Sequence, residues 1–384
     1  MKKKKKLKNK DVIVISSKQM TRDVELYLAK YLKKKKKLYL IFVISSVMKS
    51  NVKFYKEKFA GIFDEFIAEP NELECLSNDI NHKILYQQAK DIEKFAGMSI
   101  YRLFFADRVV GVGFWASGGF HHPMTKLRKE TSHIDILKIA IAKAYFWKSL
   151  LERKNLILAI NIPHFAHIFA QKMNIISERL QGARFGNNQF WSKDLYIQPD
   201  NIEKTFNSFK NRKFSPVIID KPYKAHLTFR KKHIHNFKLS TTIRRSSLLL
   251  LKNIYGKIKG YRKSKNLYLF NEFIGNWRTR MQFLELNKSI NTNIQEASKI
   301  KYIFYPLQTE PEIALVGVAQ DFFFQLTAIN LLSRDLPSDH RIIVKEHLYA
   351  VGRRPTNFYK QIKSLKNVLI ADPTEYGLDY VKNA

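Results

Sequence analysis

The sequence of 384 residues contains a single cysteine, Cys75, which excludes an intrachain disulfide and favours a reducing compartment. We expect Cys75 to be a small buried side chain and not a nucleophile. Acidic residues are also scarce, 33 against 68 lysines and arginines, and the formal net charge is +35. Such an excess favours an anionic neighbour: nucleic acid, a phosphorylated substrate or an acidic membrane face. A coding bias that favours lysine, without functional meaning, explains the excess equally well. Much of the charge lies in the runs 2–6 and 33–37, which suit solvated ends better than a shaped binding groove.

Long hydrophobic runs are absent. The longest apolar stretch, residues 38–48, contains two serines and is well short of the roughly 20 residues that span a bilayer. Lysines 2–6 and the apolar residues 12–15 do not form a signal peptide, because the apolar run is too short and no small-residue cleavage site follows. We therefore expect a cytoplasmic protein, with the inner face of the cytoplasmic membrane as a candidate peripheral location.

The first half of the chain alternates between strand and helix patterns. Residues 11–16 read as a buried parallel strand, 22–32 as a helix and 38–44 as a second strand. This β-α-β opening is typical of a doubly wound sheet. No glycine-rich loop follows the first strand, so we expect no dinucleotide site there.

Further elements support an α/β class over the first 200 residues. The pattern predicts helices at 84–95 and 134–153, a strand at 99–105 and a buried strand at 156–160. We expect three regions: an N-terminal α/β domain (1–213), a basic helical connector (214–290) and the start of a C-terminal domain (291–384).

The predicted connector alternates basic clusters with apolar and aromatic residues. An interdomain helix with a solvated basic side is the favoured interpretation, and contact with an anionic lipid surface is the alternative. The same charge and aromatic residues would suit a nucleic-acid-binding protein. No recognised nucleic-acid motif is present, so nucleic acid is not the expected partner.

Polar side chains follow two apolar strands near the end of the chain. The strand 341–344 leads into Lys345, Glu346 and His347, and then into Arg353 and Arg354. The strand 302–305 leads into a segment that carries three more candidate residues, namely Gln308, Glu310 and Glu312. Open α/β sheets bind ligands at the carboxyl ends of their strands. A histidine beside lysine and arginines suits a phosphate or carboxylate ligand.

No Asp-x-Asp motif is present in the segments that carry these candidates, and we expect no metal. The histidine pairs at 121/122, 164/167 and 233/235 lack a convincing third ligand. For each pair a packing or surface role is favoured.

The segments FYPLQTEPE, LPSDHRIIVKEH and RRPTNFYKQIKSLKNVLIADP, in that order, resemble the capsule polysaccharide and surface-carbohydrate biosynthesis family, which includes the β-Kdo transferases. The similarity covers residues 300–373 clearly and 95–120 more weakly. It implies a GT-B-like glycosyltransferase with two Rossmann-type domains, of which 1–213 is the acceptor-side domain and 291–384 is the start of the nucleotide-sugar-binding domain. The implied donor is a nucleotide-activated sugar, with a CMP-linked sugar and Kdo as candidates. The implied acceptor is a glycan or a lipid-linked molecule. No further cofactor is implied.

The resemblance also implies site roles. A His-Pro pair of the family contacts the donor phosphate, which carries over to His347, although Leu348 replaces the proline here. Gln308, Lys345, Glu346, Arg353 and Arg354 are the other donor-side candidates. Three carboxylates are candidates for the base that deprotonates the acceptor: Glu310, Glu312 and Asp107.

Proteins of this family continue past the last strand, so we expect the C-terminal domain to be incomplete in this chain. A non-catalytic remnant of the transferase is accordingly an alternative function.

Overall fold

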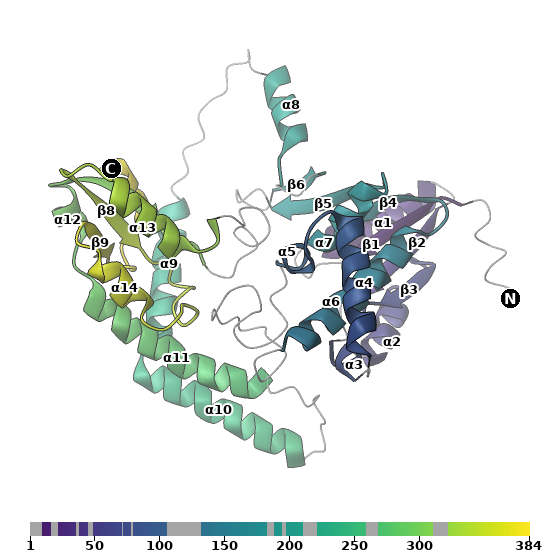
Figure 1. The fold of residues 1–384 in the computed structure, drawn as a ribbon, viewed down its shortest axis with the longest axis horizontal. Coiled ribbons are helices and arrows are strands. Elements are labelled where there is room, and N and C mark those ends of the chain that lie inside the picture. Colours follow the sequence, from purple (N-terminus) through teal and green to yellow (C-terminus); the bar gives the residue numbers. More distant parts are fainter. Residues whose placement is uncertain are drawn as a thin grey trace. The chain divides into compact units, whose positions relative to one another are not determined.

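The computed structural model describes residues 10–16, 22–35, 38–44, 49–70, 72–77, 80–105, 132–182, 188–193, 197–209, 221–258, 268–309 and 322–384 (Figure 1). These residues form two compact units. The N-terminal unit comprises the described residues up to Phe105 and from Ser132 to Phe209. The C-terminal unit comprises those from Lys221 to Ala384.

The N-terminal unit is built on a six-stranded sheet in the order β3-β2-β1-β4-β5-β6. The strands are β1 (Val12–Ser16), β2 (Tyr39–Ile44), β3 (Glu65–Ala68), β4 (Leu156–Ile160), β5 (Ile176–Gly182) and β6 (Gln189–Ser192). The first five pair in parallel, and β6 is an antiparallel edge strand. The predicted α/β class with a mostly parallel sheet is confirmed.

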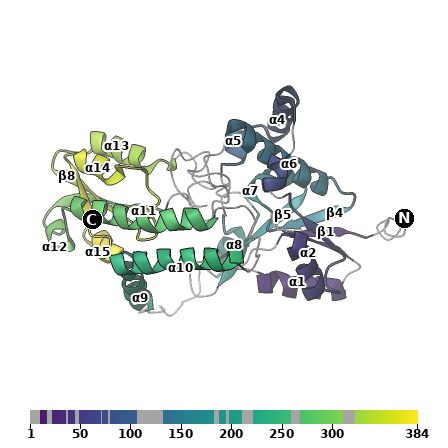
Figure 2. The ribbon, with the colours of Figure 1, turned by 90° about the horizontal axis from the view of Figure 1, so that it is seen from below.

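Helices cover both faces of this sheet (Figure 2). On one side lie α1 (Arg22–Lys35) and α2 (Lys49–Lys58). Ala29 of α1 and Phe59, which follows α2, are in one buried cluster with Leu40 and Phe42 of β2. On the other side lie α4 (His82–Ala96), α5 (Ile100–Leu103) and α6 (His133–Leu151). The remaining helices of the unit are α3 (Glu72–Leu76), α7 (His164–Lys172) and α8 (Asp200–Ser208). Strands buried on both faces read as continuous apolar runs, as Val12–Ser16 does.

The predicted strand at 99–105 is wrong, because these residues begin the short helix α5. The Ser99 side chain accepts a hydrogen bond from the Arg102 backbone N–H (3.3 Å), and the Glu93 carboxylate accepts one from Ile100 N–H (2.9 Å). Side-chain oxygens that satisfy the first N–H groups of a helix stabilise its start. The apolar residues of this segment are therefore buried by a helical turn instead of a strand.

The C-terminal unit contains a separate sheet of three parallel strands in the order β7-β8-β9. These are β7 (Lys301–Pro306), β8 (His340–Lys345) and β9 (Val368–Ala371). The helices of the unit are α9 (Lys221–Asn236), α10 (Leu239–Ile258), α11 (Tyr268–Ser289), α12 (Ile294–Ala297), α13 (Gln325–Asp335), α14 (Phe358–Ser364) and α15 (Gly377–Lys382).

Alternate residues of β8 build two cores, one on each face of the small sheet. Ile342 and Val344 pack with Ile329 of α13 and Ile362 of α14. Ile343 packs on the opposite face in a cluster that includes Tyr302 of β7 and Tyr380 of α15. The α13 and α14 crossovers therefore cover the same face, in a Rossmann-like arrangement.

The helical segment 214–290 is part of the C-terminal unit where it is described. Phe237, which follows α9, and Leu286 of α11 are both buried in the cluster that contains Ile342. The rings of Phe237 and Phe283 are stacked with centroids 4.2 Å apart. The end of α9 and the second half of α11 are therefore packed against the sheet that follows them.

Across the described parts of both units, every helix is too short or too polar to cross a bilayer.

Candidate functional site

The three strands of the small sheet end side by side. Pro306 of β7 pairs with Lys345 of β8, which pairs with Ala371 of β9, and the Leu307 N–H extends the ladder to the Lys345 carbonyl (2.9 Å). Parallel strands present their carboxyl ends at one edge of a sheet. The segments after β7, β8 and β9 are therefore neighbours, and Gln308 and His347 lie at the same edge.

Glu346 is a buried carboxylate surrounded by donors. Arg354 donates to it from Nε and Nη2, both at 2.8 Å, and the Tyr359 hydroxyl donates at 3.0 Å. The His347 backbone N–H donates at 2.6 Å. Burial, followed by the nearby Glu346 charge, raises the pKa of Tyr359 well above its usual value, so its hydroxyl remains a donor. Four donors occupy the two carboxylate oxygens, and Glu346 acts here as a structural anion.

Arg354 is fully buried and ties several segments together. Besides Glu346, its Nη2 donates to the Gln308 carbonyl (2.7 Å), and its guanidinium lies 4.9 Å from the Phe358 ring centroid. Its own carbonyl accepts from Arg278 Nη2 (2.6 Å) and from the Gln282 amide. The Arg354 side chain therefore links Gln308, which follows β7, to Glu346, which follows β8.

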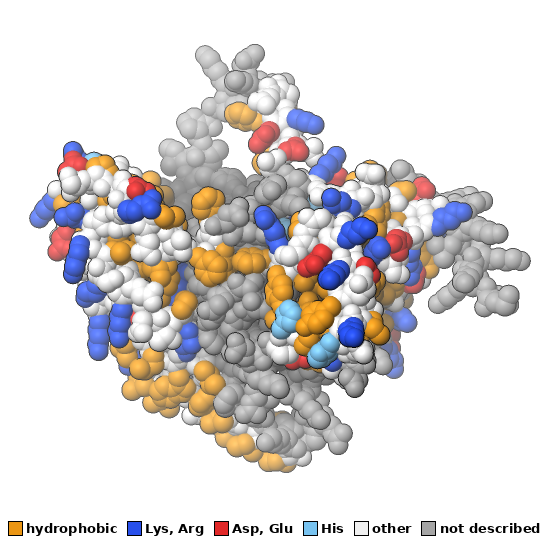
Figure 3. All heavy atoms as spheres, viewed as in Figure 1, with side chains coloured by type: hydrophobic (Ala, Val, Ile, Leu, Met, Phe, Trp, Pro, Cys, Tyr) orange, Lys and Arg blue, Asp and Glu red, His pale blue; other side chains and the backbone are white. Residues whose placement is uncertain are grey.

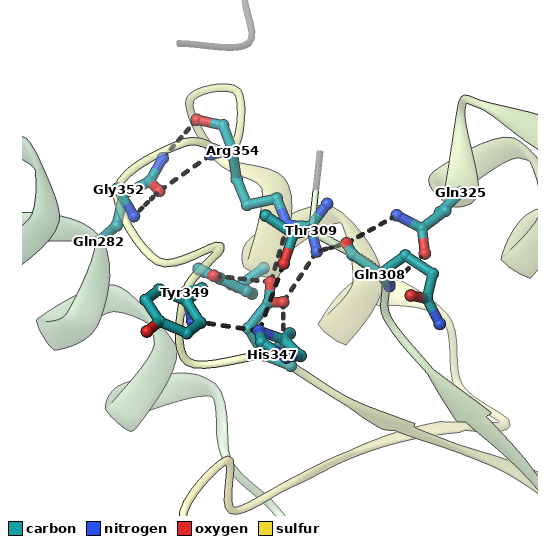
Figure 4. Close-up of polar contacts among 10 residues, drawn as sticks. Gln282, Gln308, Thr309, Gln325, His347, Tyr349, Gly352 and Arg354 are labelled. Atoms are coloured by element: carbon teal, nitrogen blue, oxygen red, sulfur yellow. Dashed lines mark hydrogen bonds and ion pairs between the residues drawn. The ribbon is translucent and has the colours of Figure 1, made fainter. Parts of the chain in front are cut away.

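Two glutamines fix the backbone of the flanking loops (Figure 4). The Gln325 side chain of α13 accepts from the Gln308 N–H (2.7 Å) and donates to the Gln308 carbonyl (3.1 Å). The Gln282 side chain of α11 accepts from the N–H groups of Gly352 (2.8 Å) and Arg354 (3.2 Å). Neither glutamine was among the predicted site residues. Gln282 carries no local signal, because it lies 70 residues before Gly352 in the chain.

His347 is exposed at this edge with its ring orientation set by its neighbours. The Tyr349 backbone N–H donates to Nδ1 (3.3 Å), and the Thr309 hydroxyl lies 3.3 Å from the same nitrogen. The ring stacks on Tyr349 with an interplanar angle of 15°. A backbone N–H can only donate, so Nδ1 accepts, and Nε2 carries the proton of the neutral ring. The imidazole therefore presents an N–H donor on its Nε2 side.

The residue after His347 does not disturb the loop. The Ala350 N–H donates to the His347 carbonyl (2.7 Å), which closes a turn with Leu348 at its second position. Proline is favoured at that position of a turn, and leucine occupies it here. Leu348 is buried among Val344, Val351 and other core residues, which anchors the turn.

The other predicted site residues have different positions. Lys345 is half-buried and donates from Nζ to the Pro373 carbonyl (3.1 Å), and burial lowers the pKa of its amine. Arg353 is half-buried in the same loop as Arg354. The carboxylates of Glu310, Glu312 and Asp107 lie outside the described residues, and their role as base stays a prediction.

An aromatic cluster adjoins His347. The His233 ring lies 4.2 Å from Phe229 and from Tyr349, measured between centroids, and Phe229 lies 6.1 Å from His347. Burial lowers the pKa of His233, and the charges of Lys232, His347 and Arg245 lower it further. His233 is therefore a packing residue, as the sequence favoured, and it contacts the Tyr349 ring that also stacks on His347.

The lowered pKa of His233 predicts that the C-terminal unit loses stability in mild acid. Above the usual histidine pKa of about 6.5, both the folded and unfolded forms are neutral and the group has no effect. As the pH falls through that value the unfolded chain binds the proton first, so the free energy of unfolding decreases, by about 1.4 kcal/mol for each unit of difference between the two pKa values. Urea unfolding at pH 7.5 and 5.0 measures the change. His233→Phe should reduce it, and His340→Gln should not.

Two further features of the structure are consistent with structural roles. His167 is buried, with its ring nitrogens 2.6 Å from Ser177 Oγ and 2.9 Å from the Lys193 carbonyl. Cys75 is buried, as the sequence predicts.

Within the described ranges, no group of three or more histidine, cysteine or acidic side chains is placed to hold a metal ion. A groove of about 440 Å³ between β6 and α8 is lined by Trp191, Phe206 and other residues of the N-terminal unit, and none of the predicted site residues lines it.

No protein-family model matches the chain, and no curated protein gives a significant match to it.

Proposed function

We propose that the chain is a GT-B-like glycosyltransferase of surface polysaccharide assembly, which transfers a sugar from a nucleotide-activated donor to a glycan or lipid-linked acceptor. The observation that carries the proposal is the exposed His347 on a braced loop at the carboxyl edge of a parallel sheet. Open α/β folds bind phosphorylated ligands at such an edge. The order of the C-terminal motifs supports the choice of reaction.

In the proposed reaction, the acceptor hydroxyl oxygen bonds to the anomeric carbon of the donor. The bond from that carbon to the phosphate oxygen breaks, and its electron pair leaves with the nucleotide. One of Glu310, Glu312 and Asp107 takes the acceptor proton. His347 donates from Nε2–H to the phosphate, where negative charge develops as the bond breaks. Arg353 is a second candidate contact for that charge.

The buried residues beneath His347 have a positioning role in this proposal. Glu346 and Arg354 form hydrogen bonds with each other and with backbone groups. In this proposal they orient the loop and do not face the donor. Gln308 contributes an exposed side chain from a backbone that Gln325 and Arg354 hold on both sides. Preorganised donors of this kind stabilise a leaving phosphate without reorganisation at the moment of reaction.

Two substitutions at His347 separate the roles of its ring nitrogens. His347→Gln keeps an N–H near the position of Nε2, whereas His347→Asn keeps an acceptor near Nδ1 and loses the outer donor. We expect His347→Asn to weaken CMP or UDP binding about 10- to 100-fold, the cost of one hydrogen bond to a charged group. His347→Gln should retain part of the affinity. Isothermal titration calorimetry with CMP and UDP measures the effect.

A matched control lies at the opposite end of the same strand. His340 begins β8 and its Nδ1 lies 2.7 Å from Asp339, so His340→Asn should leave nucleotide binding unchanged. If neither nucleotide binds, or if His347→Asn binds as tightly as the unchanged protein, the proposed donor site is wrong. Binding without sugar transfer would instead favour the non-catalytic remnant.

A further inference from the structure

The second half of α10 turns its apolar side outward. Leu250, Leu251, Ile254 and Ile258 are 52%, 61%, 55% and 77% exposed. With 100° per residue these four positions share one side of the helix. Among the described side chains of α10, those below one-tenth exposure are polar, namely Thr241, Thr242 and Ser246, and they lie in its first half. A helix that packs onto a water-soluble core instead buries its apolar side.

The adjoining helix α11 has an exposed apolar stripe of its own. Ile274, Trp277, Met281 and Leu284 follow one another at intervals of three and four residues and are 37% to 62% exposed. The opposite side of α11 carries the buried Gln282 and Leu286. The two helices run side by side (Figures 1 and 2), and hydrophobic side chains gather over them in Figure 3. We call the exposed apolar residues of α10 and α11 the hairpin face.

The segment that contains α9 and α10 carries side-chain charge of one sign. The 51 residues between Asp220 and Glu272 contain 14 lysines and arginines and no carboxylate side chain. Arg244 is exposed on α10 beside its apolar side, and Lys252 is exposed farther round the same helix. Basic residues at the edge of an apolar helical face are typical of a helix that lies in an anionic membrane interface. Tryptophan and tyrosine, here Trp277 and Tyr255, favour the same depth.

We propose that the hairpin face binds the surface of an anionic lipid bilayer, with α10 and α11 in the plane of the interface. A second copy of the chain is a poorer occupant, because a two-fold contact would set the basic edge of one hairpin near that of its partner. Nucleic acid would match the charge but not an apolar face of eight side chains. The inference rests on the hairpin alone and does not depend on the glycosyltransferase proposal.

Vesicle sedimentation with the full chain tests the proposal. Vesicles of phosphatidylcholine with 30% phosphatidylglycerol are expected to bind the protein, and vesicles of phosphatidylcholine alone much less. The combined variant Leu251→Ser, Ile254→Ser and Ile258→Ser should weaken binding at least about tenfold, because it removes apolar area from the interface. Lys252→Gln should weaken it about fivefold. The residues of both variants are exposed, so the fold should survive.

The control pair lies on another exposed helix of the same unit. Leu378 and Val381 of α15 are 50% and 53% exposed, and serine at both positions should leave vesicle binding unchanged. A second readout locates the contact: lipids brominated on their acyl chains should quench tryptophan fluorescence, and Trp277→Phe should remove most of that quenching.

Three outcomes would overturn the proposal. Vesicle binding that survives the triple serine variant would assign it to other basic segments, such as the lysine run at 2–6. A monodisperse dimer that the triple variant dissociates, with no vesicle binding, would assign the hairpin face to self-association. RNA binding that the triple variant abolishes, again without vesicle binding, would assign it to nucleic acid.

Discussion

Replacement of Glu346 by glutamine is expected to lower the free energy of unfolding of the C-terminal unit by about 3–5 kcal/mol, the usual cost of removing one partner of a buried ion pair. The loss is large because Arg354 is fully buried and keeps its charge without the carboxylate. Glutamine also offers one acceptor oxygen where Glu346 accepts from Arg354, Tyr359 and His347 N–H. Urea unfolding, followed by hydrogen exchange of the β8 amides, measures the stability of this unit alone.

The reciprocal variant Arg354→Met should be comparably destabilising, since it leaves Glu346 as the uncompensated buried charge. The double variant Glu346→Leu with Arg354→Met should lose less stability than the sum of Glu346→Leu and Arg354→Met measured singly, because no charge is then left buried. The exposed pair of Lys301 and Asp339 at the other end of the sheet is the control, and Asp339→Asn should leave stability nearly unchanged. Equal effects of Glu346→Gln and Asp339→Asn would contradict the structural role assigned to Glu346.

The strands that the sequence predicts share one property. β1, β2 and β8 carry continuous apolar runs whose inner residues are almost fully buried, such as Val14 and Ile343, and a run of that kind is a strong strand signal. β3 and β5 lack such a run, and the sequence therefore does not predict them. Glu65–Ala68 is short and half-buried, and Ile176–Gly182 contains Glu178 and Arg179. Their pairing is decided by neighbouring strands far away in sequence.

The candidate site also has a part that the sequence predicts and a part that it does not. The position of Lys345, Glu346 and His347 at a strand end could be predicted, because the apolar run before them fixes where the strand stops. Which of the three faces outward could not, since it depends on Arg354 reaching back to Glu346. The triplet on its own suits a ligand site or a solvated terminus equally well. Only the tertiary contacts show that Glu346 and Arg354 are bonded to each other inside the unit.

Tertiary contacts also explain why the helices before β7 matter to the site. Gln282 and Arg278 of α11 bond to the backbone at Gly352 and Arg354. The same helix carries the exposed stripe of the hairpin face on its other side. A displacement of α11 would therefore move or release the backbone of the loop that carries His347. The two proposals are therefore related physically through α11, and neither depends on the other.

Gly352→Ala should therefore be among the most damaging single changes, with an expected loss of about 2–5 kcal/mol in the stability of the C-terminal unit. Two causes add. Gly352 has a φ of +95°, a conformation that L-residues adopt only with strain. A Cβ there would also lie 2.9 Å from the Thr279 Cα of α11 and closer still to the Thr279 hydroxyl. A backbone atom cannot rotate away, so α11 and the loop must separate.

Substitutions at two other glycines separate the effect of the positive φ from the effect of the steric clash. Gly61 has a φ of +78° and no atom within 4 Å of an added Cβ, so Gly61→Ala reports the conformational strain without a clash. Gly377 has no positive φ, and an added Cβ would be in ordinary contact at 3.8 Å from Phe304, so Gly377→Ala should be nearly neutral. We expect the loss of stability to rank Gly352 above Gly61 above Gly377. Because Gly352 N–H also bonds to Gln282, only Gly352→Ala should weaken nucleotide binding as well. A loss at Gly352 no larger than at Gly61 would show that α11 does not pack tightly against the loop.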